Sequence, residues 1–269
     1  MDFKCALVTG GGGGIGRALS EYFISKSVKV ILVGRTESNL QSTAKEIGAA
    51  AYYVLDTGNT AAIPEFVARV TREHPEIDCL VNNAGIQRPL DATKDDAETF
   101  LEKADKEIDV NIRGPMHLAL HFLPHFRGKQ GGQPQPCTIM NVSSGLGFVP
   151  FSIINPVYNG TKAWVHFWSL NLRTQLGKQG GGLEHVRVVE IVPPMVESDL
   201  HREREDPDDN KKKNNNMALT MAEFMKDVTQ GLEGGKTTVG AGMALKSIEK
   251  WEGAFGGMYE DAAKGWGKK

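Results

Sequence analysis

Two residues in the middle of the chain, Tyr158 and Lys162, have the types and the spacing of an acid–base pair. They stand four positions apart at the start of an apolar stretch that favours a helix, and residues at i and i+4 share one helix face. A phenol has an ordinary pKa near ~10, so it becomes a useful base at neutral pH only where a cation favours the phenolate. The pair therefore predicts proton exchange with an alcohol or a carbonyl oxygen. A half-buried tyrosine beside a solvated lysine is the alternative that the spacing alone leaves open.

The beginning of the chain has the pattern of a strand, a glycine turn and a helix. Residues 3–9 are apolar, an unbroken glycine run extends from Gly10 to Gly14, and residues 15–19 open a helix after it. Glycines let main-chain amides approach a pyrophosphate closely, and a helix N-terminus favours negative charge. The spacing Gly10-x-x-x-Gly14-x-Gly16 therefore predicts a dinucleotide site. A flexible glycine linker is the alternative.

Five motifs in this order resemble the short-chain dehydrogenase/reductase family. They are the glycine motif preceded by Thr9, Asn82-Asn83-Ala84-Gly85, Asn111, Ser144 and Tyr158-x-x-x-Lys162. The resemblance runs over approximately residues 1–200 and implies an oxidoreductase with a Rossmann-type fold. Three stretches, 86–89, 141–158 and 193–200, are more narrowly similar to the branch named for D-alanine esterification of teichoic acids.

The resemblance implies a catalytic set made of Asn111, Ser144, Tyr158 and Lys162. Ser144 is preferred to Ser143 as the group that holds the substrate oxygen, because the second serine of such a pair normally has this role. Asparagine is unfavourable inside a helix, and the resemblance implies that Asn111 interrupts its helix and carries a proton-relay water to Lys162. In the reductive direction Tyr158 would donate the proton, and Ser144 would stabilise the developing charge.

The end of the second predicted strand carries information on the cofactor. Gly34-Arg35-Thr36 stands roughly twenty residues beyond the glycine motif, where a carboxylate would bind the ribose of NAD. Arg35 instead offers a planar cation suited to the 2′-phosphate of NADP, so NADP(H) is expected in preference to NAD(H). A surface arginine without this role is the alternative. The resemblance implies that the cofactor also contacts Gly10, Gly14, Ile15, Gly16, Asp56, Thr57, Asn83, Ala84, Gly85, Tyr158, Lys162, Pro193, Val196 and Ser198.

Strand and helix patterns alternate along the chain. Apolar runs bounded by glycine, proline or asparagine predict seven strands near residues 3–9, 28–33, 50–55, 77–82, 137–143, 186–192 and 237–240. Near-continuous apolar strands are typical of a parallel sheet covered on both faces. We therefore expect an α/β fold with a doubly wound, mainly parallel sheet, formed by a single Rossmann-type domain over residues 1–269.

Composition narrows the possible partners and the compartment. The chain has 31 basic and 33 acidic residues, so no strong field favours nucleic acid or an anionic membrane. No apolar run approaches the roughly 20 residues of a membrane span, and Asp2 and Lys4 stand where a signal peptide would be apolar. The protein is therefore expected to be cytoplasmic.

Two sets of residues with metal-ligating side chains are expected to have other roles. Three cysteines fall in three different predicted strands and should be reduced, buried thiols. Three histidines recur at every fourth position of one helix, but no further ligand accompanies them, so no metal site is expected. These residues are Cys5, Cys79, Cys137, His117, His121 and His125.

A substrate lid is expected at residues 199–217. Its centre, from Glu203 to Asn216, is charged and rich in asparagine, so it should be mobile without ligand. A solvated surface insertion is the alternative. The apolar residues expected to close over the substrate are Met217, Leu219, Met221 and Phe224, and some of Phe148, Phe151 and Ile153 should form a wall of the site.

These patterns together predict an NADP(H)-dependent oxidoreductase that acts on a carbonyl group or a secondary alcohol of a small molecule. A non-redox isomerase or cyclase on the same fold, and a catalytically silent nucleotide-binding regulator, are the alternatives. The resemblance implies a homodimer or homotetramer that pairs through helices at residues 104–127 and 157–178. Trp164, Phe167 and Trp168 make the second of them unusually apolar for a surface helix.

Overall fold

The computed structural model describes residues 2–129 and 135–266. In this part of the chain, seven parallel strands form one sheet in the order β3-β2-β1-β4-β5-β6-β7. The expected doubly wound sheet is confirmed, and each strand ends within two residues of its predicted bounds. The strands are β1 (Cys5–Thr9), β2 (Lys29–Gly34), β3 (Ala51–Val54), β4 (Cys79–Asn82), β5 (Cys137–Val142), β6 (Val186–Val192) and β7 (Thr238–Gly240).

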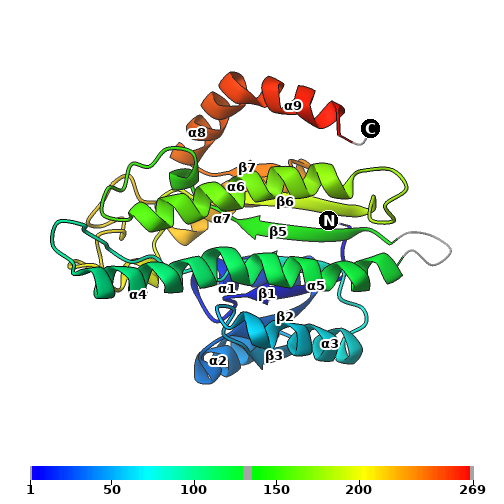
Figure 1. Ribbon diagram of the computed structural model, residues 1–269. Coiled ribbons are helices and arrows are strands. Elements are labelled where there is room, and N and C mark those ends of the chain that lie inside the picture. The colour runs from blue at the N-terminus through cyan, green and yellow to red at the C-terminus, as the bar shows by residue number, and fades with distance from the viewer. Residues whose placement is uncertain (1, 130–134, 267–269) are drawn as a thin grey trace.

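Helices cover both faces of this sheet (Figure 1). One face carries α1 (Gly14–Ser25), α2 (Glu37–Ile47) and α7 (Met221–Glu233), and the other carries α3 (Ile63–Glu73), α5 (Gly114–Gly128) and α6 (Pro156–Leu176). The remaining helices are α4 (Ala97–Ile108), α8 (Met243–Trp251) and α9 (Gly257–Lys264). α9 is joined to α6 by the Tyr259 hydroxyl, which donates to the carbonyl of Leu170 at 2.6 Å. No helix among the described residues is apolar over a length that would cross a membrane.

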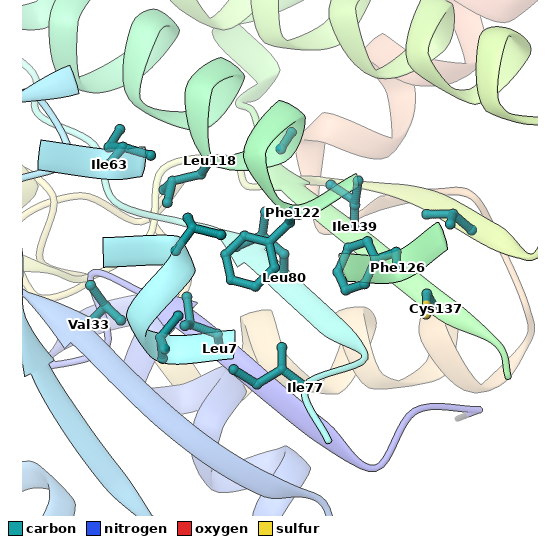
Figure 2. Packing of buried hydrophobic residues seen from close by; sticks show 14 of the residues in the cluster. Leu7, Val33, Ile63, Ile77, Leu80, Leu118, Phe122, Phe126, Cys137 and Ile139 are labelled. Atoms are coloured by element: carbon teal, nitrogen blue, oxygen red, sulfur yellow. The ribbon is translucent and has the colours of Figure 1, made fainter. Parts of the chain in front are cut away.

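The core lies on both sides of the sheet because buried strand residues alternate between its faces. Leu7 and Leu80 pack with Phe122 and Phe126 of α5 in one cluster (Figure 2). The neighbouring strand residues pack with side chains of α1 and α7 in a second cluster on the other face. Each large apolar side chain buried in this way contributes about 1.5–3 kcal/mol, so the sheet is a rigid platform for whatever lies at its edge.

The carboxyl ends of β1 and β4 mark the point where the order of the strands reverses. The chain runs outward from β1 to β3 on one side and from β4 to β7 on the other. Connections after neighbouring strands leave in opposite directions at such a point, and this opens a crevice in which ligands bind. The predicted glycine motif and Asn83-Ala84-Gly85 come directly after these strands.

The three cysteines are free and buried, and they lie in β1, β4 and β5. Burial raises the pKa of Cys5 to about 12 and that of Cys137 to about 11. Thiols with such pKa values stay protonated and unreactive at neutral pH, so they serve as small apolar groups in the core.

Candidate active site

The glycine turn after β1 is closed by contacts that leave no space for side chains at two positions. Gly10 has a φ of +65°, which favours glycine. A Cβ at Gly16 would lie only 2.3 Å from the carbonyl oxygen of Gly10, whereas a Cβ at Gly13 would meet no atom within 4 Å. The turn therefore packs closely against the protein at Gly10 and Gly16 and is open at Gly13. An open main-chain cradle at a helix N-terminus suits a pyrophosphate.

The motif after β4 holds this turn in place. The Asn83 side chain donates from Nδ2 to the carbonyl of Thr9 at 2.9 Å, and the Thr9 hydroxyl accepts from the amides of Asn83 and Ala84 at 3.0 Å. Two sequence motifs separated by more than seventy residues thus form one structural unit. This explains why an asparagine and a threonine are needed here in addition to the glycines.

A cleft of about 1090 Å³ opens at the carboxyl edge of the sheet. The structure brings fifteen of the predicted site residues to its wall, from the glycine turn to the segment after β6. Two predicted residues lie behind the wall: Gly16 in the closed turn and Asn111 in the helix beneath. The residues at the wall are Gly10, Gly14, Ile15, Arg35, Asp56, Thr57, Asn83, Ala84, Gly85, Ser144, Tyr158, Lys162, Pro193, Val196 and Ser198.

Tyr158 and Lys162 lie side by side in the first turns of α6, and both are buried. The Lys162 ammonium donates to the carbonyl of Val142 at 2.8 Å and lies 5.5 Å from the centre of the Tyr158 ring. Burial lowers the pKa of Lys162 to about 8, while the carboxylates of Glu107 and Glu190 act to raise it. A lysine in this state is charged near neutral pH and close to its titration point.

The Tyr158 phenol is held in its protonated form. Burial raises the pKa of Tyr158, and the negative charge of Glu107 raises it further. A hydrogen bond with Ser144 and the positive charge of Arg204 act in the opposite direction. The spacing predicts a phenolate favoured by Lys162, but in this structure burial is the largest influence on Tyr158 and favours the protonated phenol. The group is therefore set up as a proton donor.

The two serines after β5 have different surroundings. The Ser143 hydroxyl donates to Oε1 of Glu190, whose other oxygen pairs with Nδ1 of His166 at 2.9 Å. The Ser144 oxygen accepts from the amide of Leu146 at 3.2 Å and lies at the wall of the cleft. Because the hydrogen of Ser143 is already used by a buried carboxylate, Ser144 is the serine better placed to donate to a substrate.

Asn111 lies in a π-helical turn, Asp109–Arg113, between α4 and α5. Its amide accepts from the N–H of Ile86 and donates to the carbonyl of the same residue, both at 2.9 Å, and it also donates to the Thr161 hydroxyl at 3.1 Å. The sequence analysis expected a helix interrupted at this position. The structure shows a widened turn in a continuous helix, and π-turns of this kind are frequent at functional sites.

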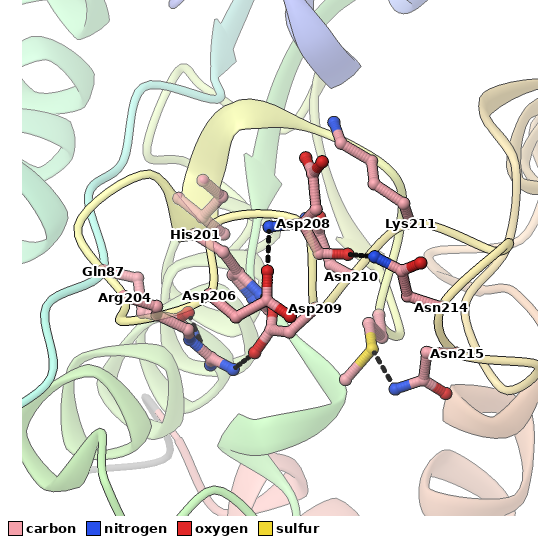
Figure 3. A network of polar contacts seen from close by, with 12 residues as sticks. Gln87, His201, Arg204, Asp206, Asp208, Asp209, Asn210, Lys211, Asn214 and Asn215 are labelled. Atoms are coloured by element: carbon pink, nitrogen blue, oxygen red, sulfur yellow. Dashed lines mark hydrogen bonds and ion pairs between the residues drawn. The ribbon is translucent and has the colours of Figure 1, made fainter.

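The segment predicted as a lid is tied to the rest of the site by polar contacts (Figure 3). The Arg204 guanidinium pairs with Asp209 at 2.5 Å, and it also donates to Gln87 at 2.9 Å and to Asn155 at 2.8 Å. Asn210 is buried and donates to the carbonyls of residues 196 and 198. The sequence analysis found no apolar anchors in this segment, and the anchors that the structure supplies are polar.

Leu219, Met221 and Phe224, expected to close over the substrate, pack in the core instead, and this prediction was wrong. Of Phe148, Phe151 and Ile153, some of which were expected to form a wall of the site, Phe151 does so. Phe224 is fully buried beneath the sheet with Leu219 and Met221 beside it, because the helix α7 turns this face toward β6 and β7. Phe148 packs against His166, with ring centres 4.1 Å apart. Ile153 is exposed and lies outside the wall of the cleft. Of the seven side chains expected at the lid or at the wall of the substrate site, Phe151 and Met217 line the cleft.

Other residues at the wall were missed by the sequence analysis. Gln87 and Arg204 meet there across 117 positions of sequence, and Lys246 and Lys250 of α8 reach the wall from the C-terminal region. No local motif marks these residues, since their placement depends on contacts between distant segments. In the sequence, the i, i+4 spacing of Lys246 and Lys250 indicates that they share one helix face, but it does not indicate that this face lies at the cleft.

The histidine and tryptophan repeats form packed surfaces. The rings of Trp164 and Trp168 stack with centres 5.3 Å apart, and Nε2 of His125 lies 2.8 Å from the carbonyl oxygen of Ile77. Within residues 2–129 and 135–266, no group of three or more histidine, cysteine or acidic side chains has the geometry to hold a metal ion.

Comparison with known proteins supports the resemblance. The family model described as short chain dehydrogenase matches residues 4–209. The uncharacterized oxidoreductase DltE of Bacillus subtilis is 32% identical over 239 residues, which cover 89% of this chain and 88% of that protein. The NADP-dependent 3-hydroxy acid dehydrogenase YdfG of Escherichia coli K12 is 36% identical over 191 residues, 71% of each chain.

A solved structure agrees with both matches. The 3-ketoacyl-(acyl-carrier-protein) reductase of Brucella melitensis, complexed with NADH, has a TM-score of 0.71 and 28% identity, and the match covers 85% of this chain and 90% of that one. The predicted family and the similarity to the DltE branch are confirmed. The glycine turn and the Tyr158–Lys162 pair agree with the family model that matches residues 4–209. This chain therefore belongs to the short chain dehydrogenase family.

Proposed function

We propose that the protein uses NADP(H) to transfer hydride between nicotinamide and a carbonyl group or secondary alcohol of a small molecule. The observation that carries this proposal is the convergence of Ser144, Tyr158 and Lys162 on one cleft with an open glycine cradle at its other end. When bound, the cofactor supplies or accepts the hydride. The protein supplies the proton and the stabilisation of charge.

The residues of the cleft divide this work between them. In reduction, the Tyr158 phenol donates its proton to the substrate oxygen, and the Ser144 hydroxyl donates a hydrogen bond as negative charge develops there. Lys162, with a pKa lowered to about 8, is charged at neutral pH and stabilises the phenolate that remains. In oxidation the same groups work in reverse.

Arg35 is the residue proposed to select NADP(H). It is exposed at the end of β2 and lines the cleft beside Thr36 and Asn39. A guanidinium group there can pair bidentately with a 2′-phosphate. The name of YdfG, NADP-dependent, favours this assignment, whereas the bound NADH of the Brucella melitensis reductase shows that this fold also accepts the other cofactor.

The cleft and the lid suggest the substrate class only in outline. Leu146, Val149, Phe151 and Met217 give the substrate end apolar walls, and residues 199–217 are proposed to close over it. A small carbonyl compound with an apolar portion fits such a site. The protein is proposed to act in the cytoplasm.

Assembly into a homodimer or homotetramer is also proposed. Leu120 of α5 and Phe167 of α6 are about half exposed, and large apolar side chains on neighbouring helices are typical of a subunit contact. Light scattering at micromolar concentration should give at least twice the 29.3 kDa mass of the chain. A mass of one chain would contradict this assembly.

The experiment that tests the function follows nicotinamide absorbance while NADPH or NADH is mixed with aldehydes, ketones and quinones. We expect loss of NADPH with at least one substrate and a slower reaction with NADH. If neither cofactor is consumed with any of them, while NADPH still binds, the chain is a nucleotide-binding protein or a non-redox enzyme.

A further inference from the structure

A buried carboxylate, Glu107, lies on α4 one helical turn before Asn111. Its side chain is 0% exposed. Oε1 accepts from the main-chain N–H of Arg88 at 2.5 Å, and Oε2 has no hydrogen-bond partner among the residues that the structure describes. A carboxylate removed from water with one oxygen unpartnered is costly. Such a group is a candidate for a role in the adjacent site.

The contacts around Glu107 lead to the catalytic lysine. Asn111, on the following turn, bonds Ile86 and Thr161, and Thr161 is the residue before Lys162. A Cβ built on Gly85 would lie 3.3 Å from Asn111 Oδ1 and 3.6 Å from Lys162 Nζ. The segment after β4 is thus held between α4 and α6, with Glu107 on one side of it and Lys162 on the other.

The charged groups that act on Glu107 come from three other elements. Arg88 on the segment after β4 and Lys162 on α6 favour its ionised form, and Glu203 on the lid disfavours it. Arg88 itself pairs with Glu203 at 2.8 Å. Burial is the largest influence and raises the pKa of Glu107 to about 7. Glu107 therefore gains its charge near neutral pH.

We propose that Glu107 is a positioning residue that acts through its charge to keep the protons on Lys162 and Tyr158. The proposal rests on the proposed function, because it assigns to Glu107 the maintenance of the proton donor that reduction requires. A negative charge favours the ammonium form of a neighbouring lysine and disfavours a neighbouring phenolate. Both effects keep the protons on Lys162 and Tyr158.

The sign of the pH dependence follows. Glu107 is neutral well below pH 7 and charged above it. It therefore acts most in the range where Lys162, with a pKa lowered to about 8, would otherwise lose its proton. Removing the charge should move the titration of Lys162 to lower pH.

The direct test is an NMR titration of isotope-labelled lysine side chains, with Lys162 assigned by its absence in Lys162→Met. In Glu107→Gln, whose amide oxygen can still accept from Arg88, we expect the pKa of Lys162 to fall by about 1 unit. Glu102→Gln is the matched control, since it makes the same change on the exposed face of α4, and it should leave Lys162 unchanged. An unchanged pKa of Lys162 in Glu107→Gln would overturn the proposal.

A second variant separates charge from hydrogen bonding. Glu107→Met removes both the charge and the acceptor for the Arg88 amide, so a role in charge predicts the same shift of Lys162 in Met and Gln variants. A structural role predicts a disturbed Met variant and a Gln variant that titrates like the natural protein. If the Gln variant does not fold, an unchanged pKa of Lys162 in the Met variant would still overturn the proposal.

Activity adds a third readout. The rate of reduction should fall on the alkaline side at a pH about 1 unit lower in Glu107→Gln than in the natural protein, and the two should agree well below pH 7. The NMR titration needs no turnover. Absence of NADPH oxidation would therefore contradict the proposed function and leave the test of Glu107 intact.

Discussion

The nucleotide side and the substrate side of the cleft are built in different ways. On the nucleotide side, the turn after β1 is made of main chain and glycines, and its supports, Thr9 and Asn83, are short side chains with fixed partners. On the substrate side, charged groups from residues 199–217, α4 and α6 act on one another over long stretches of sequence, and those of α4 and α6 are buried. The first arrangement holds a ligand common to many enzymes, whereas the second can vary with the substrate.

The same contrast appears in two buried carboxylates behind the active site. Glu190 on β6 has both oxygens occupied, by Ser143 and His166. Glu107 has one oxygen occupied, by a main-chain amide, and one unpartnered among the described residues. The hydrogen bonds of Glu190 join β5, β6 and α6, whereas Glu107 is held by one bond and is influenced by the charges of Arg88 and Glu203.

The largest expected effect is on the substrate side. Tyr158→Phe keeps the buried ring beside Lys162 and removes only the proton donor. We expect kcat to fall by about 100-fold or more, while NADPH binding, measured by fluorescence titration, stays within about twofold. A variant that retains more than about a tenth of kcat would remove Tyr158 from its proposed role.

The next effect concerns the nucleotide side. Arg35→Ala should weaken NADPH binding by about tenfold to a hundredfold, since a charged hydrogen-bonded contact contributes about 1.5–3 kcal/mol. NADH lacks the 2′-phosphate, so its affinity should change little. Calorimetric titrations with both cofactors measure this difference. Equal losses for the two would show that Arg35 does not select the cofactor.

A change inside the glycine turn should affect stability as well as binding. The methyl group of Gly16→Ala would lie 2.3 Å from the carbonyl oxygen of Gly10, and overpacking of this kind costs about 1–3 kcal/mol. Gly160→Ala is the control: it is an exposed helical position where a Cβ meets no atom within 4 Å, so it should gain about 0.5–1 kcal/mol. Urea unfolding compares the two. Equal stability of both variants would contradict the tight turn.

The smallest effect is expected at the lid. Arg204→Met removes the bonds to Gln87, Asn155 and Asp209, so limited proteolysis within residues 206–216 should become several-fold faster. In the natural protein, NADPH with a substrate should slow this cleavage. If cleavage is equally fast with and without ligands, and the cleaved enzyme keeps its full kcat/KM, the segment is not a lid.

The strands and the glycine turn could be predicted because each depends on residues that stand close together in the sequence. Apolar runs bounded by turn residues indicate strands, and the motif that begins at Gly10 needs only short-range geometry. The substrate side was predicted less well. Phe224 was expected at the lid because it follows Met217 in an apolar stretch, but the face of α7 on which it stands is fixed by packing against the sheet.

The roles proposed for Glu107 and Arg204 could not be predicted from the sequence. Both are charged residues in charged surroundings, which normally indicate solvated surface. Glu107 is buried and Arg204 is partly buried where α4, the segment after β4 and residues 199–217 approach one another, and these contacts join residues up to 117 positions apart. Only in the folded chain do both charges act on the pKa of Tyr158, and that of Glu107 also on the pKa of Lys162.

The most direct test of the proposed function follows the hydride itself. The protein is mixed with a carbonyl substrate and NADPH that carries deuterium in place of both hydrogens on the hydride-bearing carbon, and the product is analysed by mass spectrometry. Hydride transfer predicts an alcohol that carries one deuterium on its carbinol carbon, formed in step with oxidised cofactor, and predicts its loss in Tyr158→Phe. A product without deuterium, or a product formed while NADPH remains reduced, would contradict the proposed function.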